Sequence, residues 1–587
     1  MNTLYKSILI AGLGMVSLAA MAQKDSTLTR QVLLEREYNP TMLDASKINT
    51  TPSIFTPEVK AKQFNFVSSA PQLNITSNQL GKVSSGDINT TVDFSKKRGY
   101  LDIGGGTHAN IEGAAGVRII NSATDRLDLF ATHSSTNGMI DYIDGKKYLE
   151  EDVKAKYSAT NVNLKYQHFF EPSILSFDAS FFNTAYNYYG NSFIMAGASD
   201  VLPFDIDSKQ NVDVISIGAG LKSSLKNEGE LKYDGNIRYQ SFKSKFGPVT
   251  KEFAPKGGQL DLDLNFYADL DADKVVGVKG NFMNHSFGNE ELFEEAFHNL
   301  TTITGTPYIK LQGSTWNVDL GVNVSGIFDI KKKLHFSPNV KADVSIYDVN
   351  VLYFEATGGV NNNTYLDILQ ENRYMTPETR VEYSKTLFDL KAGFKSGVIS
   401  GFEFDLFAGY KKTDNDHLYL RSYTETWSNV SIPTYADIST GHIGGLIKTN
   451  LIPRTDLYAK IVSYFYTVKY DNEHMLPSGE LLSEKKAWGL PSFVAEFNAD
   501  IRPIDKLILS LNYTYAGGRK TYAQTTESNS MVSMKDVNEL SVKGTYQVTN
   551  WLSVYAKANN ILNQKYELQY GYPLQGFNAL GGLSFKF

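Results

Sequence analysis

The residues best suited to chemistry in this chain are few and widely separated. The run Asp414-Asn415-Asp416-His417 offers oxygen and nitrogen ligands to a cation. It lacks the spacing and the terminal glutamate of a calcium loop, so an ordinary polar loop is the favoured interpretation. The nine histidines form no H-x-x-x-H pair, and no G-x-S-x-G nucleophile motif occurs. We therefore predict no catalytic residue and no metal ligand.

Two other patterns have both a functional and a structural interpretation. The acids Glu290, Glu291, Glu294 and Glu295 could act as acid–base partners, but a solvated helix face fits their spacing better. The three glycines at 104–106 resemble part of a phosphate loop, yet no helix follows them, and a kink in a strand is favoured. No cofactor is predicted.

Composition excludes further classes of protein. The 587 residues include no cysteine, which argues against a disulfide scaffold, a Cys-ligated zinc site and a thiol nucleophile. The net charge of -6 is mild for this length, so no nucleic-acid partner is expected. The 35 Tyr and 34 Phe against 17 Pro suit long strands with aromatic girdles, although a large soluble β-protein would also fit.

A secretory signal peptide is predicted at residues 1–22. Lys6 precedes an apolar run, and Ala20 and Ala22 are the small residues of a cleavage site directly before Gln23. The run is too short to span a bilayer as a helix. Residues 23–85 carry several prolines and little apolar periodicity, so they are predicted to form an extended periplasmic segment, with a first strand possible within it.

The elements that must position any site are long strands. Residues 260–266, 316–324, 402–410 and 507–515 alternate apolar with polar side chains. Runs of this length exceed the usual soluble strand of about five or six residues and match a tilted crossing of a bilayer. The fold class predicted for residues 86–587 is therefore all-β, a large antiparallel transmembrane β-barrel with lipid outside and water inside.

Connections that alternate between short and long support this fold and give a strand count. Short turns are predicted at positions that include 95–98 and 331–333, and long loops at positions that include 287–305, 360–381 and 414–437. Counting from Gly86 gives about twenty-one strands, and one more between residues 63 and 80 would make the number even. The prediction is 18–22 strands, with 22 favoured.

The polar face of the predicted strands indicates which side chains point into the lumen. These residues mix both signs of charge, as a hydrated interior would. The candidates are Asp261, Asp263, Asp319, Asp343, Asp389 and Lys391.

The last strand carries an assembly signal. In residues 577–587, Phe577, Leu583, Phe585 and Phe587 share one face, and the strand closes on an aromatic residue. Before it lie residues 551–566 and 571–576, and the whole region resembles the closing hairpin of TonB-dependent receptors, which show a V-x-N-L-F-D-x-x-Y stretch, a glycine turn and a terminal aromatic. The chain departs from that pattern at Gln575 and Asn578, where many receptors carry Pro and Arg.

The resemblance implies a 22-stranded barrel filled by an N-terminal plug of well over one hundred residues. Only about sixty residues separate Gln23 from Gly86, so the barrel is predicted to be plugless. A lumen of this width needs another occluding element. Residues 290–300 and 365–369 have helical spacing and are candidates for it, although external decoration is slightly favoured for the second.

Three functions follow from these expectations. The first is a solute transport channel of the cell outer membrane, passive or gated by a partner. The second is a non-transporting scaffold subunit of an outer-membrane assembly, and an enzyme is a distant third. Expected partners are outer-membrane lipid, the barrel-assembly machinery and a periplasmic or surface protein, but no nucleic acid.

Overall fold

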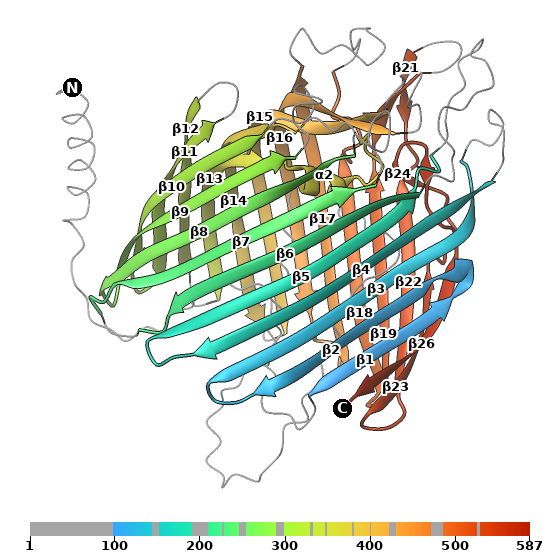
Figure 1. Ribbon diagram of the computed structural model, residues 1–587, viewed down its shortest axis with the longest axis horizontal. Helices are drawn as coiled ribbons and strands as arrows, with labels where there is room; N and C mark the ends of the chain where they lie inside the picture. Colours follow the sequence, from blue (N-terminus) through green and yellow to red (C-terminus); the bar gives the residue numbers. More distant parts are fainter. Residues whose placement is uncertain are drawn as a thin grey trace. The chain divides into compact units, whose positions relative to one another are not determined.

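A closed ring of strands makes up the fold. The computed structural model describes residues 98–143, 152–190, 209–225, 228–245, 254–288, 299–328, 333–346, 349–377, 381–399, 401–421, 430–470, 485–524 and 529–587. Within these ranges 22 strands form one antiparallel sheet that closes on itself, with the strands strongly tilted (Figure 1). The signal peptide, its cleavage residues Ala20, Ala22 and Gln23, and the segment to residue 85 lie outside the described residues.

The first half of the ring follows chain order. Its strands are β1 (Gly99–Gly106), β2 (Ile111–Asn121), β3 (Asp125–Asp141), β4 (Asp152–Phe169), β5 (Ser173–Asn187), β6 (Lys209–Ser223), β7 (Lys232–Ser244), β8 (Lys256–Asp271), β9 (Lys274–Phe287), β10 (Leu300–Gln312) and β11 (Trp316–Phe328).

The second half continues in the same way. Its strands are β12 (Lys333–Ile346), β13 (Asn350–Asn362), β14 (Tyr383–Ile399), β15 (Phe402–Arg421), β16 (Ser431–Thr449), β17 (Thr455–Lys469), β18 (Phe493–Ile504), β19 (Leu507–Gly517), β22 (Val537–Gln547), β23 (Leu552–Asn559) and β26 (Asn578–Lys586).

A few short elements lie in the connections on the long-loop side. They are η1 (Thr107–Ala109), α2 (Tyr365–Glu371), and two small hairpins, β20 (Lys520–Gln524) with β21 (Asn529–Ser533) and β24 (Glu567–Gln569) with β25 (Tyr572–Pro573). No helix among the described residues is long and apolar enough to cross a membrane.

The ring closes between its first and last strands, which lie side by side in Figure 1. Tyr100 is opposite Lys586, and Gly106 is opposite Leu580. The backbone N–H of Gly99 donates to the carbonyl oxygen of Phe587 at 2.7 Å, and the N–H of Phe587 donates to the carbonyl of Gly99 at 3.0 Å. The final residue therefore takes part in closure, so no sheet edge remains there.

The predicted count of 22 strands is confirmed, but the predicted route to it was wrong. All 22 strands of the ring lie between Gly99 and Lys586, so none comes from residues 63–80, and the first ring strand begins after the turn predicted at 95–98. The sequence count overlooked the turns between β10 and β11 and between β12 and β13. It also placed the connection at 331–333, between β11 and β12, on the short-turn side, whereas that connection lies on the long-loop side.

Two motifs considered for chemistry are parts of strands. The glycines at 104–106 lie in β1 and pair with β2 and β26, as the strand interpretation predicted. The Asp414–His417 run is not a loop: it forms a bulge in β15, where the register shifts between Thr413 and Asp416 and Asn415 has φ of 55°. A bulge leaves one residue unpaired and bends the strand.

Candidate functional site

The wall of the barrel has two chemically different faces. On one face large apolar side chains are more than half exposed, a contiguous surface suited to lipid tails. Examples are Ile215, Ile217, Leu406, Ile443 and Ile461. The alternate positions of the same strands carry most of the polar side chains, and the contacts described below place them inside.

The helix α2 is a short element held by its own cap. The Thr364 hydroxyl accepts from the Asp367 N–H at 3.3 Å, and the Asp367 carboxylate accepts from the Thr364 N–H at 3.2 Å, which makes a complete capping box. Seven residues are too few for a helix that is stable alone. Its stability must therefore come from packing.

That packing is against the inner face of the wall. Tyr365, Ile368 and Leu369 of α2 are buried in one cluster with residues from the long-loop ends of β5, β6, β7 and β9, namely Tyr186, Val212, Val214, Phe242 and Phe287. The ring of Tyr365 stacks on Phe242 at 5.1 Å between centroids, and its hydroxyl is 2.8 Å from the Ser244 hydroxyl.

The position of α2 is a correction to the sequence analysis. α2 belongs to the connection between β13 and β14, yet it packs on strands four to eight positions away around the ring, and Figure 1 shows it within the outline of the barrel. The preference for external decoration at residues 365–369 was therefore wrong: this segment occludes part of the lumen. Most of the other candidate, residues 290–300, lies outside the described residues.

The segment after α2 is fastened by aromatic contacts. Tyr374 stacks on Tyr572 of β25 with 3.7 Å between ring centroids, and Tyr189 packs edge-on against both rings. Burial raises the pKa of Tyr374 and of Tyr572, so both stay neutral phenols. The Arg373 guanidinium lies 3.9 Å above the ring of Tyr157.

Backbone pairing extends this fastening to the other side of the mouth. The N–H of Thr376 donates to the Ser431 carbonyl at 2.7 Å, and the N–H of Ser431 donates to the Tyr374 carbonyl at 2.8 Å. We call residues 363–377 the lid. The lid is thus bound both to the β5–β9 wall and to the start of β16.

A charged contact joins the lid to β15. Nε2 of His417 is 2.6 Å from Oε2 of Glu371, and the Tyr419 hydroxyl donates to the same oxygen at 2.9 Å. Burial would raise the pKa of Glu371, but His417 and these hydrogen bonds hold it below its ordinary value, so it is a carboxylate when the lid is in place. Asp416 lies on the other side of His417, with Oδ1 3.7 Å from Nδ1.

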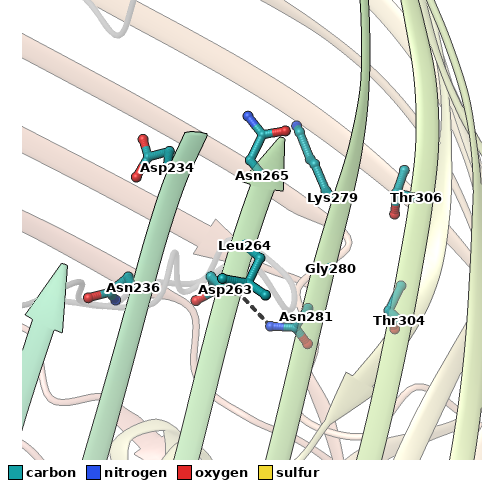
Figure 2. A pocket seen from close by; sticks show the side chains of 10 residues that line it. All are labelled: Asp234, Asn236, Asp263, Leu264, Asn265, Lys279, Gly280, Asn281, Thr304 and Thr306. Carbon is teal, nitrogen blue, oxygen red and sulfur yellow. Dashed lines mark hydrogen bonds between the residues drawn. The ribbon is translucent and has the colours of Figure 1, made fainter. Parts of the chain in front are cut away.

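The inner wall carries a polar hollow of about 310 Å³. Along β7 it lies about 20 Å from the lid, at roughly 3.3 Å per residue, toward the short-turn end. Figure 2 shows its lining, which comes from β7, β8, β9 and β10. Cross-strand register arranges eight polar side chains in two rows. One row is Asn236, Asp263, Asn281 and Thr304, and the other is Asp234, Asn265, Lys279 and Thr306. We call these eight residues the polar grid.

The six residues predicted to face the lumen lie on the face of the wall on which α2 packs, since each is in register with others on that face. Asp263 belongs to the grid and accepts from the Asn281 amide at 2.7 Å, and Asp261 accepts from Gln259 at 2.9 Å. Asp319 pairs with Lys310 at 3.3 Å. Asp343 accepts from Asn317 at 3.0 Å.

The remaining two lie on β14. Asp389 is opposite Lys411 of β15, and Lys391 is opposite Glu355 of β13, with its ammonium over the rings of Tyr353 and Phe407. The six candidates are therefore spread around the ring and are not one site. No group of three or more acidic or histidine side chains among the described residues is placed to hold a metal ion.

The candidate assembly residues lie on or beside β26. Phe577, Leu583 and Phe587 are exposed, and Phe585 stacks on Trp551 at 6.2 Å between ring centroids. Sequence reasoning missed the tyrosines that hold the lid, the Glu371 contact and seven of the eight grid residues. The signal available for the tyrosines was the sequence cluster of Tyr186, Tyr188 and Tyr189.

Comparison with solved structures identifies the barrel. The FrpB iron transporter of Neisseria meningitidis superposes with a TM-score of 0.62 at 11% identity, over 84% of this chain and 82% of that one. The ferripyoverdine receptor of Pseudomonas aeruginosa gives 0.59 at 13% identity, over 84% and 72%. The siderophore receptor PiuA of Acinetobacter baumannii gives 0.59 at 9%, over 84% and 82%.

The chain has the barrel fold of TonB-dependent receptors. It is a multi-pass β-barrel of the outer membrane. At these identities the likeness is one of fold. These neighbours of the receptor-type barrel are receptors and transporters, not enzymes. No family model and no curated protein matches the sequence. The presence or absence of a plug concerns residues before 98, outside those described.

Proposed function

We propose that this chain is a solute transporter of the outer membrane whose mouth is closed by its own lid and opens when the lid leaves the wall. The observation that carries the proposal is the burial of α2 against the inner face of β5–β9. A 22-stranded barrel has a lumen wide enough to need an occluding element, and the lid supplies part of one.

Opening and local unfolding of the lid are coupled. Because α2 is too short to persist without its packing, release from the wall melts the helix as it clears the lumen. A partner protein, at the surface or in the periplasm, then gates the channel if it binds the released lid more tightly than the docked lid. Passive opening corresponds to the same equilibrium without a partner.

Conductance in planar bilayers tests this proposal. In Ile368→Asp a carboxylate replaces a lid side chain that is fully buried between α2 and the wall, which costs several kcal/mol unless the lid undocks. We expect closed channels for the wild type and frequent openings for the variant. Ile368→Val, which keeps the packing, is the matched control and should stay closed.

A non-transporting scaffold is the second candidate, favoured by the number of places where the lid is fastened. Aromatic stacking on β25, backbone pairing with Ser431 and the Glu371 contact would suit a permanently closed barrel. A folded Ile368→Asp barrel that never conducts would overturn transport. Stoichiometric partners that co-purify in mild detergent would then support the scaffold, with outer-membrane lipid and the assembly machinery as partners in either case.

A further inference from the structure

The polar grid has the composition of a site for uncharged hydroxylated ligands. Sugar hydroxyls both donate and accept hydrogen bonds. They are therefore recognised by amides and hydroxyls, which also do both, and by carboxylates and ammonium groups, which do one of the two. The grid offers two carboxylates, three amides, two hydroxyls and one ammonium on eight neighbouring positions.

The charges of the grid largely cancel. Asp234 lies 3.3 Å from the Lys222 ammonium, and the Lys279 ammonium stands one row from Asp263 on the adjacent strand. A site for an anion or a polycation would show an excess of one sign. This near-neutral balance favours a neutral solute.

The grid also keeps hydrogen-bonding capacity for a ligand. Part of it is used within the wall: the Asn281 amide donates to Asp263, and the Thr306 hydroxyl donates to Asn323 at 2.7 Å. Among the described residues the side chain of Asn236 has no hydrogen-bond partner, and the Asn265 amide nitrogen donates to none, although its oxygen accepts from Tyr308 at 3.0 Å.

Geometry suits a chain of rings lying across the strands. Neighbouring strands are about 4.8 Å apart, so the four columns of the grid repeat at a distance close to the length of one pyranose unit. The two rows are separated by two residues along each strand, about 6.6 Å. Tyr308 lies two residues after Thr306 on β10 and places an aromatic ring at the edge of the grid.

We infer that the polar grid is a binding subsite for neutral oligosaccharides of a few pyranose units within the transport path. The inference rests on the proposed transport function and adds the solute class to it. The lid closes the long-loop end, so in detergent a ligand reaches the grid from the short-turn end.

Calorimetric titration of the full-length chain in detergent tests the subsite, with maltotriose as the neutral probe and citrate and spermidine as charged ones. We expect maltotriose to bind, and Asp263→Ala and Asn236→Ala each to weaken it at least tenfold. Asp389→Ala, on the inner face of β14, is the control and should change it less than twofold. Heat-modifiable migration in gels verifies that each variant is folded. If Asp263→Ala does not fold, the effect of Asn236→Ala on maltotriose binding is the test.

The outcomes separate this inference from the proposed function. Absence of maltotriose binding, equal weakening by the β14 control, or stronger binding of citrate or spermidine would each overturn the subsite. Binding needs no conduction. A barrel that binds maltotriose at the grid but stays closed in Ile368→Asp would therefore refute transport and keep the subsite. A barrel that opens in Ile368→Asp but does not bind maltotriose would refute the subsite and keep transport.

Discussion

Replacing Glu371 by glutamine should open the lid, because this carboxylate is the charged link between α2 and β15. The substitution keeps the shape of the side chain and removes its charge. Its partners, His417 at 2.6 Å and Tyr419 at 2.9 Å, then lose their charge-assisted hydrogen bonds.

The expected cost follows from the environment of the contact. A net hydrogen bond to a charged group contributes about 1.5–3 kcal/mol. Removing one partner of a fully isolated buried ion pair costs more, about 3–5 kcal/mol, but His417 keeps Asp416 nearby at 3.7 Å. We therefore take about 1.5–3 kcal/mol, which lowers the closed-to-open ratio by roughly tenfold to a hundredfold at 1.4 kcal/mol per decade.

Acidification should mimic the substitution. The pKa of Glu371 is below its ordinary value of 4.5 in the docked lid and returns to that value on release. The released state therefore binds more protons, so the contribution of Glu371 to closure is complete above about pH 4.5 and is lost as the pH falls through the lowered pKa. Open probability should rise in the wild type as the pH falls below about 4.5, and much less in Glu371→Gln.

Single-channel recording at neutral and acidic pH measures both effects. Glu403→Gln is the matched control, since Glu403 lies on β15, the strand of His417, but near the short-turn end, 3.9 Å from Lys448 and half exposed. If Ile368→Asp opens the channel while Glu371→Gln leaves the open probability unchanged, the Glu371 contact contributes nothing to closure and the reasoning fails.

Three smaller perturbations have defined outcomes. Thr364→Ala removes the cap of α2, at a cost of about 1 kcal/mol, and should raise open probability about fivefold. Deletion of Phe587 removes backbone hydrogen bonds to Gly99 that close the ring, and we expect unassembled protein without heat-modifiable migration; normal insertion would contradict this. Ile217→Lys places a charge on the lipid face at a cost of about 2–4 kcal/mol, so its urea midpoint in lipid should fall, unlike that of Ile217→Leu.

The strands of this barrel were predictable because each has a signal within a few residues of itself. Alternation of apolar and polar side chains over 260–266 or 402–410 indicates that one face of the strand contacts lipid and the other does not. The strands β8 and β15 contain those runs. Turn assignment was weaker. The connections after Gln312 and Ile346 are short, and apolar periodicity continues on both sides of them, so four strands were counted as two.

The lid was not predictable, since its position depends on residues far away in sequence. Spacing at 365–369 indicated a helix but not which surface it covers. That surface is assembled from Tyr186, Phe242 and Phe287 on three different strands. The Asp414–His417 run was misassigned to a loop for a similar reason: the bulge in β15 directs His417 at Glu371, and nothing near it in sequence records that partner.

The separation of lid and grid decides what can operate the gate. Asn236 of the grid and Phe242 under the lid lie on the same strand, six residues apart, about 20 Å at 3.3 Å per residue. Perturbations at sites farther apart than about 10 Å and without shared partners add within about 0.5 kcal/mol. A solute on the grid touches neither α2 nor Glu371, and a ligand shifts an equilibrium only through a difference in its affinity for the two states. The effects of Asn236→Ala on maltotriose binding and of Glu371→Gln on opening should therefore be independent in the double variant. Coupling well above 0.5 kcal/mol would mean that the wall of β7 and β9 transmits occupancy to the lid, and the trigger would then be the solute itself.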